Sequence, residues 1–384
     1  MNKRVYLDNS ATTPVAPEVL EAMERYFEQE YGNASSLHAL GRQARKAIEE
    51  SRGEIADTLG VTPKEIVFTG GATEANNLAI KGLAFAHPEK RHLVTCKTEH
   101  HAVLHTCQWL QERGLEITYL DVDRFGRVSP DQFVEAIRDD TLLVSIMVGN
   151  NEIGTLQPIE QIGTICREHG VFFHTDAVQA YGKVPLPMDT IDLLSVSAHK
   201  LHGPKGVGFL VVRKGVSLTP LLHGGGHEGG RRSTTENTPG IVGLAAATRL
   251  AFREMQSTTT RMRQYRQQLI ASVTNIPGTR LNGHETESLP HIVNVSFQAI
   301  EGESLVMKLD ELGFAVSTGS ACSSPNLEPS HVLVAIAVPL SMAHGSLRIS
   351  TGRQTTQEEI DAFLEVLPRA VEELRAISPF KVGA

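Results

Sequence analysis

Short apolar runs and helical patterns alternate along the first half of the chain. Runs rich in β-branched and aromatic residues are expected as buried strands at 65–69, 92–95, 117–120, 142–148 and 171–175. Because helical patterns fill the intervals, the strands are predicted to form a mainly parallel sheet with helices on both faces. The run 206–212 follows the preceding strand too closely for a crossover helix, so we expect it to join the sheet as an antiparallel strand.

The second half of the chain indicates a smaller domain. A long helical stretch covers 241–275, and a further pattern of strands and helices runs over 292–374. A length of 384 residues favours two or three domains. We therefore expect an α/β architecture with a large domain over 15–255 and a smaller α+β domain built from 1–14 and 256–384.

Charge and hydropathy argue against several functional classes. The formal net charge of -8 argues against a nucleic-acid-binding surface or a polybasic membrane patch. The first residues contain no apolar leader segment, and apolar runs such as 142–148 are far too short to span a bilayer. The sequence thus predicts a cytoplasmic protein without direct nucleic-acid or membrane contacts.

Two polar residues stand at the ends of neighbouring predicted strands. Asp176 ends the run 171–175, and Lys200 follows the short apolar strand that begins at Ser195. Ligands of open α/β sheets bind at the carboxyl ends of the strands. A pyridoxal phosphate site needs a lysine that forms a Schiff base and a carboxylate that keeps the pyridine nitrogen protonated. A lone lysine here would usually be an exposed loop residue, and Asp176 is what favours the cofactor site.

A glycine-rich turn joins the strand 65–69 to the next helix. The stretch 70–77 contains Gly70, Gly71, Ala72 and Thr73 immediately before the helical pattern. Glycines let backbone N–H groups face an anion, and the helix dipole adds to that attraction. The turn predicts a phosphate cradle, although many strand-to-helix turns contain glycines, and it lacks the G-x-G-x-x-G pattern of dinucleotide sites.

The four cysteines fall into two groups. Cys96, Cys107 and Cys166 lie in strand or helix patterns and are expected as small core residues. Cys322 lies in the polar segment 317–326, which has no strand or helix period. None of the four forms a C-x-x-C pair, so neither a disulfide framework nor a metal site is predicted.

Three motifs in one order resemble those of a known family. They are D-A-x-Q at 176–179, S-x-H-K at 197–200 and S-x-G-S-A-C-[ST]-S at 317–324. Together they resemble the cysteine desulfurases of the NifS and IscS kind, pyridoxal-phosphate enzymes of the class V aminotransferase family. The resemblance extends from 6–14 to 347–350, nearly the whole chain. It implies the fold type I of pyridoxal-phosphate-dependent transferases, with a large cofactor-binding domain and a smaller domain that carries the cysteine loop.

The resemblance assigns a role to each matching residue. Lys200 would hold the cofactor and move the Cα proton, Asp176 would pair with the ring nitrogen, and Gln179 would bond to the ring hydroxyl. His100 would stack on the ring and move protons. The phosphate would be bound by Ala72, Thr73, Ser197, His199 and, from a second subunit, Thr235, although Thr234 stands where the family usually has glycine. Asn151 would contact cofactor and substrate, and Arg348 would take the substrate carboxylate as a bidentate fork.

The activity implied by the resemblance is conversion of L-cysteine to L-alanine, with the sulfur held as a persulfide on Cys322. The implied partners are a second copy of the chain and a sulfur acceptor or scaffold protein of the IscU or NifU kind, in iron–sulfur cluster assembly or thiolation. Because the segment 224–237 looks too extended to fold back alone, a homodimer is expected. A class V aminotransferase would need no Cys322, and a non-catalytic scaffold would tolerate loss of Lys200 or Arg348. Selenocysteine lyase activity stays open as well.

Overall fold

A seven-stranded sheet forms the centre of the larger part of the molecule. The computed structural model describes residues 4–319, 329–380 and 382, so Cys322 lies outside the described residues. The strand order is β2-β8-β7-β6-β5-β3-β4. The strands are β2 (Ile66–Thr69), β8 (Gly208–Val212), β7 (Leu193–Ser197), β6 (Phe172–Asp176), β5 (Thr141–Ser145), β3 (His92–Cys96) and β4 (Glu116–Leu120).

The pairing of the strands confirms both expectations for this sheet. The five strands from β7 to β4 pair in parallel, whereas β8 pairs antiparallel with β7 and with β2. The short connection between β7 and β8 holds the 3₁₀ turn Ala198–Lys200, which is too short to cross back over the sheet. The prediction of a mainly parallel sheet with 206–212 antiparallel was therefore right.

Alternate residues of the strands enter two separate cores on opposite faces of the sheet. Leu193 packs with one core and Leu194 with the other, and both are fully buried. One face is covered by α3 (Ala72–Ala86) and α4 (His101–Gln111), whose apolar residues share a core with Leu193. The other face is covered by α1 (Pro17–Glu28), α2 (Ala39–Leu59), α5 (Pro130–Ala136), α6 (Ile159–Glu168) and the first half of α7 (Thr238–Val273). Burial of both faces explains why the strands read as continuous apolar runs.

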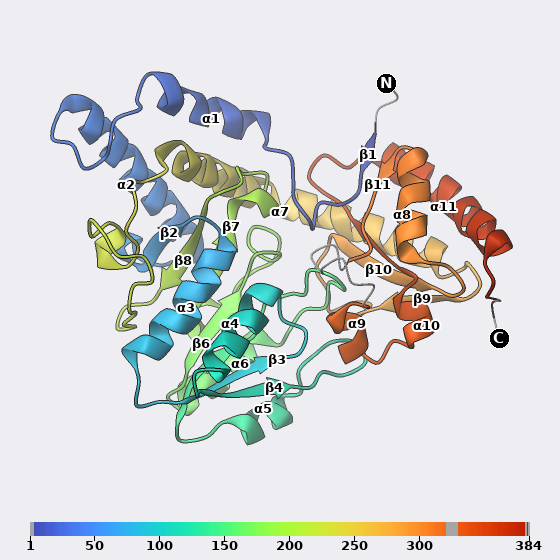
Figure 1. Cartoon of the computed structure of the whole chain (residues 1–384). Coiled ribbons are helices and arrows are strands. Elements are labelled where there is room, and N and C mark those ends of the chain that lie inside the picture. The colour runs from blue at the N-terminus through green and yellow to red at the C-terminus, as the bar shows by residue number, and fades with distance from the viewer. Residues whose placement is uncertain (1–3, 320–328, 381, 383–384) are drawn as a thin grey trace.

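A second, smaller core lies around the far end of α7. This 36-residue helix begins against the large sheet and continues into the C-terminal part of the chain (Figure 1). The three-stranded antiparallel sheet here has the order β12-β10-β9, and the short strand β1 (Val5–Tyr6) pairs in parallel with β11 (Phe314–Ala315). The sheet and helices of this core are β9 (Thr279–Asn282), β10 (Ile292–Phe297), β12 (Ser346–Ser350), α8 (Gly302–Glu311) and α11 (Gln357–Ile377). The helical prediction for 241–275 is confirmed, and the domain boundaries stay a prediction.

Two local expectations differ from the structure. Ser129 and Gln132 have the spacing of a capping box, yet the Ser129 side chain makes no capping hydrogen bond at the start of α5. Pro130 follows Ser129 directly and fixes the first turn by its restricted φ angle, so the helix begins without a side-chain cap. The predicted strand 142–148 ends earlier, because β5 stops at Ser145.

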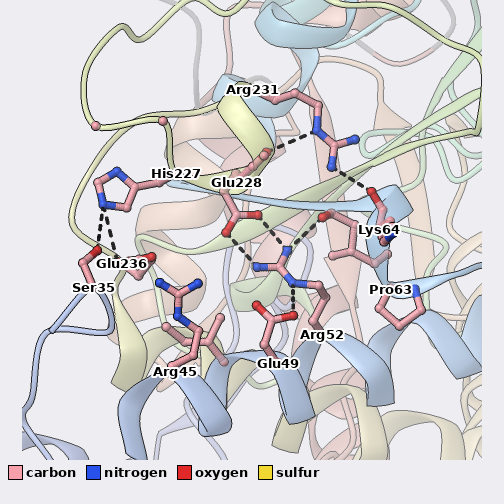
Figure 2. Close-up of a pocket in the computed structure, with 15 residues that line it drawn as sticks. Ser35, Arg45, Glu49, Arg52, Pro63, Lys64, His227, Glu228, Arg231 and Glu236 are labelled. Carbon is pink, nitrogen blue, oxygen red and sulfur yellow. Dashed lines mark hydrogen bonds and ion pairs between the residues drawn. The ribbon is translucent and has the colours of Figure 1, made fainter. Parts of the chain in front are cut away.

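The segment 224–237 is held against its own chain. Glu228 accepts two hydrogen bonds from the Arg52 guanidinium, at 2.7 and 2.8 Å, and one from the backbone N–H of Phe68. Arg231 donates to the carbonyl of Lys64, as Figure 2 shows. Together with its neighbours the segment lines a cavity of about 490 Å³. The expectation that this stretch cannot fold back alone is therefore wrong, because buried ion pairs anchor it.

Candidate active site

A cavity of about 980 Å³ opens at the carboxyl end of the large sheet. Its walls come from the loops that follow β2, β3, β5, β6 and β7, together with the N-terminal loop at 10–12 and Arg348 of β12. The carboxyl ends of parallel strands meet at one edge, so loops far apart in sequence converge there. The lining contains Ala72, Thr73, His100, Asn151, Asp176, Gln179, Ser197, His199, Lys200 and Arg348. Ten of the twelve predicted site residues thus share one cavity.

Asp176 is fixed as a hydrogen-bond acceptor at the floor of this cavity. It is the last residue of β6 and is 7% exposed. Its Oδ1 accepts the backbone N–H of Val178 at 2.9 Å, and its Oδ2 accepts the Asn76 side-chain amide at 2.7 Å. The two bonds hold the carboxyl group in one orientation. The Asn76 Oδ1 is buried and has no partner among the described residues.

Asn76 was missed as a site residue by the sequence reasoning. It lies three residues after Thr73, on the same face of α3 and one turn further along. This spacing could have identified Asn76 from the sequence, because a side chain one helical turn after Thr73 lies on the same face of the helix.

Lys200 lies in the 3₁₀ turn that directly follows β7. The residue is partly buried, and its Nζ donates to the carbonyls of Ser10 and Ala11 at 2.6 and 2.7 Å. The N-terminal loop therefore provides acceptors for this amine across a separation of about 190 residues in the sequence. Asp176 and Lys200 come from adjacent strands, β6 and β7, whose residues Asp176 and Ser195 are paired.

The glycine-rich turn leaves the N-terminus of α3 open toward the cavity. Gly71 has φ +145°, and no side chain caps the helix. A Cβ added at Gly71 would lie 3.7 Å from the Ser197 Oγ, and one at Gly208 would lie 2.4 Å from the Val196 carbonyl oxygen. Glycine is therefore required at Gly208 for close approach of the two backbones. The N–H groups at the start of this 15-residue helix have no side-chain cap and lie next to Thr73, an arrangement typical of anion-binding helix termini.

Thr235 does not take part in the cavity of its own chain. It is exposed and is absent from the cavity lining. The neighbouring Arg232 forms an ion pair with Glu74 at 2.7 Å, close to the start of α3. Segment 224–237 therefore passes beside the start of α3, while Thr235 does not line the cavity of its own chain.

Two histidines of the cavity are held as neutral rings. His100 caps α4, where its Nδ1 accepts the backbone N–H of Ala102 at 3.0 Å. Burial lowers the pKa of His100; the nearby carboxylate of Asp176 opposes that shift, and the positive charge of Lys200 adds to it. Burial and Lys200 lower the pKa of His199 to about 4, and its Nδ1 lies 3.1 Å from the Thr12 Oγ1. Both rings are therefore neutral at pH 7, and each has one donor and one acceptor nitrogen.

A cluster of histidine rings lies beside His100. The His101 ring packs 4.8 Å from His105 and 4.6 Å from His331. The spacing of His101 and His105 on α4 is typical of solvated helix histidines, but His101 is partly buried, and burial is the main reason that its pKa is lowered to about 4. Within residues 4–319, 329–380 and 382, no three His, Cys, Asp or Glu side chains are arranged to bind a metal ion.

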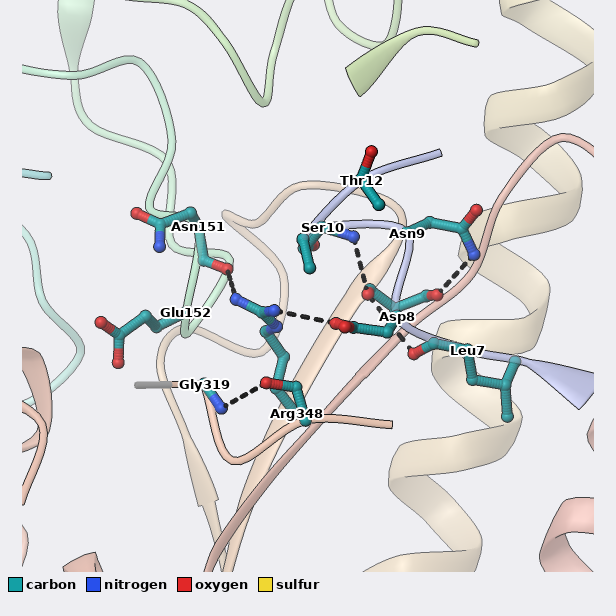
Figure 3. Close-up of polar contacts among 12 residues, drawn as sticks. Leu7, Asp8, Asn9, Ser10, Thr12, Asn151, Glu152, Gly319 and Arg348 are labelled. Atoms are coloured by element: carbon teal, nitrogen blue, oxygen red, sulfur yellow. Dashed lines mark hydrogen bonds and ion pairs between the residues drawn. The ribbon is translucent and has the colours of Figure 1, made fainter. Parts of the chain in front are cut away.

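Arg348 reaches the cavity from β12 with only part of its guanidinium engaged. The residue is 3% exposed. Its Nη2 donates to the Asp8 Oδ1 at 2.9 Å, and its Nη1 donates to the backbone carbonyl of Asn151 at 3.0 Å (Figure 3). Its Nε is buried and has no partner among the described residues. The guanidinium thus keeps a free donor for an incoming carboxylate.

Gln179 is oriented by two neighbours. Its Nε2 donates to the Ser10 carbonyl at 2.9 Å, and its Oε1 lies 3.2 Å from the His291 Nε2. It is 4% exposed. A primary amide carries two hydrogens, so one donor is left to meet a hydroxyl in the cavity.

The structure confirms the core positions of three cysteines. Cys96, Cys107 and Cys166 are free and buried, and burial raises the pKa of each thiol, for Cys107 to about 12. These side chains are inert protonated thiols at neutral pH. Cys322 lies outside the described residues, while Gly319 on its N-terminal side lines the cavity.

Comparison with known proteins places the chain in a family. Residues 5–363 match the model of the aminotransferase class-V family. The cysteine desulfurase IscS of Methanosarcina thermophila is 54% identical over 98% of this chain and 94% of the relative, and that of Dictyoglomus turgidum is 51% identical over 99% and 98%.

Solved structures agree with this match. A structure titled as a NifS-like protein superposes with a TM-score of 0.92 at 40% identity, covering 97% of this chain and all of that chain. A second, titled as SspA in complex with cysteine, gives a TM-score of 0.80 at 41% identity over 90% and 98%. The chain therefore belongs to the aminotransferase class-V family and, within it, to the cysteine desulfurases.

Proposed function

We propose that this chain converts L-cysteine to L-alanine with pyridoxal 5'-phosphate and takes up the sulfur as a persulfide on Cys322. One observation carries the proposal: Asp176, Lys200, the open terminus of α3 and the spare donor of Arg348 meet in a single cavity. Relatives that are 54% and 51% identical to this chain are named cysteine desulfurases, and a structural relative is titled as a complex with cysteine.

The residues of the cavity fit pyridoxal 5'-phosphate, the cofactor of this family. Asp176 offers a fixed carboxylate to a protonated ring nitrogen. The uncapped start of α3, with Ala72 and Thr73, offers N–H groups and a hydroxyl to the phosphate, and Ser197 and His199 stand beside it. When bound, the cofactor supplies an electron sink for the charge left on Cα after a proton is removed.

Three side chains would act on the substrate. Arg348 would bind the substrate carboxylate through its free Nε and one of its Nη groups, while Asp8 keeps the guanidinium in place. Lys200, which would hold the cofactor, would then accept the Cα proton on its Nζ. Asn151 lines the cavity, and its backbone carbonyl accepts a hydrogen bond from Arg348, so its side chain would contact substrate and cofactor.

His100 would move protons between the substrate and the solvent-facing side of the cavity. Its ring is neutral because burial lowers its pKa, so it can accept the thiol proton. Its Nδ1 accepts the Ala102 N–H, so the neutral ring carries its proton on Nε2 and would take up the thiol proton at Nδ1, once that hydrogen bond is released.

Cys322 would attack the substrate sulfur as a thiolate. A new S–S bond forms, the Cβ–S bond of the substrate breaks, and Cβ is protonated to give alanine. The transferred sulfur leaves as a formally zero-valent atom, so no external oxidant is needed. A thiol reductant or an acceptor protein then discharges the persulfide. An unperturbed thiol of pKa about 8.5 is only a few per cent ionised at pH 7, so proton uptake by His100 is required.

The assembly is a further part of the proposal. Thr235 is exposed and does not line its own cavity, which supports its placement on the phosphate of a second subunit in a homodimer. Several large apolar side chains of the N-terminal region are exposed and could be covered by that subunit: Leu20, Phe27, Tyr31 and Leu37. A monomeric mass by light scattering at micromolar concentration, together with full activity, would refute the dimer.

The cellular role is proposed from the relatives alone. The name IscS of the relatives supports delivery of sulfur to an acceptor or scaffold protein of the IscU or NifU kind in the cytoplasm, for iron–sulfur clusters or thiolation. None of the helices in the described part of the chain is long and apolar enough to cross a membrane.

The direct test is incubation of the purified protein with pyridoxal 5'-phosphate and L-cysteine, with and without a thiol reductant. Alanine and sulfide should appear in equal amounts when the reductant is present. Without reductant, formation of alanine should stop after the protein is loaded with sulfur. Absence of both alanine and sulfide would refute the proposed activity.

A further inference from the structure

Lys183 makes a contact with Lys200 that the proposed mechanism does not use. It lies in the turn that follows Asp176, seven positions further along the chain. Its Nζ donates a hydrogen bond to the backbone carbonyl of Lys200 at 3.0 Å. The two residues also line a second cavity of about 50 Å³, distinct from the catalytic cavity, beside α7. The side chain of Lys183 thus supports the backbone of Lys200 from behind.

The ammonium group of Lys183 lies in a positively charged environment. No Asp or Glu is within ion-pair distance of it in the described part of the chain, and the nearby Glu254 is paired with Arg353 at 2.7 Å. Burial, and then the positive charge of Lys200, lower the pKa of Lys183 to about 7. The titratable and charged groups that face it are Lys200, His199, His202, His291, Glu254 and Arg353. Lys183 is partly buried, and its charged form has no carboxylate partner among the described residues, so protonation costs folding free energy and marks the residue as a candidate for a function.

The contact belongs to a set that fixes the turn around Lys200. The Thr13 backbone N–H and hydroxyl both donate to the His199 carbonyl at 2.9 Å, and the His202 N–H donates to the Thr13 hydroxyl at 2.8 Å. Lys183 adds a hydrogen bond to the carbonyl of Lys200, which lies between His199 and His202 in the chain. Its removal would leave the Lys200 carbonyl without this donor and would loosen the residue that aims the amine into the catalytic cavity.

We propose that Lys183 is a positioning residue for Lys200, which holds the backbone of the cofactor-binding lysine and sets a positive charge behind it. The proposal rests on the proposed function, because it takes Lys200 as the point of cofactor attachment. A positive charge close to a basic group disfavours protonation of that group. Lys183 would therefore oppose protonation of the nitrogen that joins Lys200 to the cofactor, and later of the released amine that must accept the Cα proton.

Two substitutions separate the charge from the hydrogen bond. Lys183→Met keeps most of the aliphatic stem and removes both, whereas Lys183→Gln removes the charge and keeps a donor. The exposed Lys46, whose side chain is 76% exposed on α2, gives the matched control Lys46→Met. The loaded proteins are titrated with pH while the visible absorption of the bound cofactor is followed, and cofactor affinity is measured on the stripped proteins.

The midpoint of the spectral titration should rise by about one pH unit in both Lys183 variants, at the lower end of what one neighbouring charge does. Cofactor affinity should fall several-fold in Lys183→Met and less in Lys183→Gln, and Lys46→Met should match the wild type. A midpoint and an affinity unchanged in Lys183→Met would overturn the proposal. If Lys183→Met does not fold, the midpoint of the spectral titration of Lys183→Gln tests the proposal by itself, and an unchanged midpoint would overturn it.

Failure of the proposed function would give a different result. Borohydride reduction of the loaded wild type, followed by peptide mapping, should find the cofactor on Lys200. Cofactor on another lysine would refute the assignment of Lys200, whatever the Lys183 variants show. Cofactor on Lys200 with unchanged titrations would refute only the role of Lys183.

Discussion

Replacing Arg348 by lysine tests how the substrate carboxylate is held. The guanidinium uses Nη2 for Asp8 and Nη1 for the Asn151 carbonyl, and only its Nε has no partner in the described structure. A lysine can keep the ion pair with Asp8 as a point charge, but it cannot present a planar pair of donors to a carboxylate at the same time. We therefore expect Arg348→Lys to fold, to bind the cofactor normally and to bind L-cysteine poorly.

The magnitude follows from the hydrogen bonds that the substitution removes. The substrate would lose one hydrogen bond between charged groups, which contributes about 1.5–3 kcal/mol. Since about 1.4 kcal/mol corresponds to a factor of ten, kcat/KM should fall roughly 10- to 150-fold. The larger part should appear in KM, because the carboxylate is bound in the ground state and in the transition state alike. Removal of the bond to the Asn151 carbonyl should lower the free energy of unfolding by about 1 kcal/mol.

The assay is alanine formation over a range of L-cysteine concentrations, with urea unfolding in parallel. The control is Arg138→Lys, at an exposed arginine that pairs with Glu116 and Asp140 far from the cavity lining. It should change neither kcat/KM nor KM. If Arg348→Lys kept kcat/KM within about twofold of the wild type, the carboxylate would have to be bound elsewhere.

Three further outcomes are expected. Lys200→Ala should abolish the visible absorption of the bound cofactor and all turnover, whereas Lys205→Ala should keep the absorption; the reverse pattern would show that Lys205 is the attachment point. Cys322→Ser should keep the cofactor spectrum and lose alanine and sulfide formation, and wild type treated with cysteine should carry one extra sulfur on the Cys322 peptide by mass spectrometry. The third outcome concerns pH. Burial lowers the pKa of His174 to about 3, so between that pH and about 6.5 the unfolded state binds one more proton and stability falls as pH falls. The free energy of unfolding should therefore be about 2 kcal/mol lower at pH 5 than at pH 7 from this residue. Urea unfolding at pH 7 and pH 5 should show a smaller loss in His174→Gln, and an equal loss in both proteins would exclude His174 as the source.

The fold could be predicted because its signals are local. A strand buried on both faces is a short apolar run, and the helices between such runs force parallel pairing, so the order of runs along 65–212 predicted the sheet and its antiparallel member. Asp176 and Lys200 were found for the same reason. Residues at the carboxyl ends of adjacent parallel strands meet at one edge of the sheet, whatever the intervening chain does.

Contacts between segments distant in the sequence were not predictable in this way. Asp8 pairs with Arg348 across 340 positions, and Asn76 binds Asp176 across 100. Neither pairing leaves a periodic pattern, since each polar residue looks like an ordinary loop or helix residue by itself. The glycine-rich composition of 224–237 indicated a segment too extended to fold back alone, but composition does not reveal the buried ion pair of Glu228 with Arg52.

The sequence by itself determined the elements, the mainly parallel pairing with one antiparallel strand and the side chains that end the strands, because those depend on hydrophobic period and chain direction. Only the tertiary structure decided how the site is supported. It brought the carbonyls of the N-terminal loop to the Lys200 amine and the Lys183 ammonium to the Lys200 carbonyl. Such contacts depend on where separate elements meet in space, and a buried donor finds its acceptor only after the elements have packed.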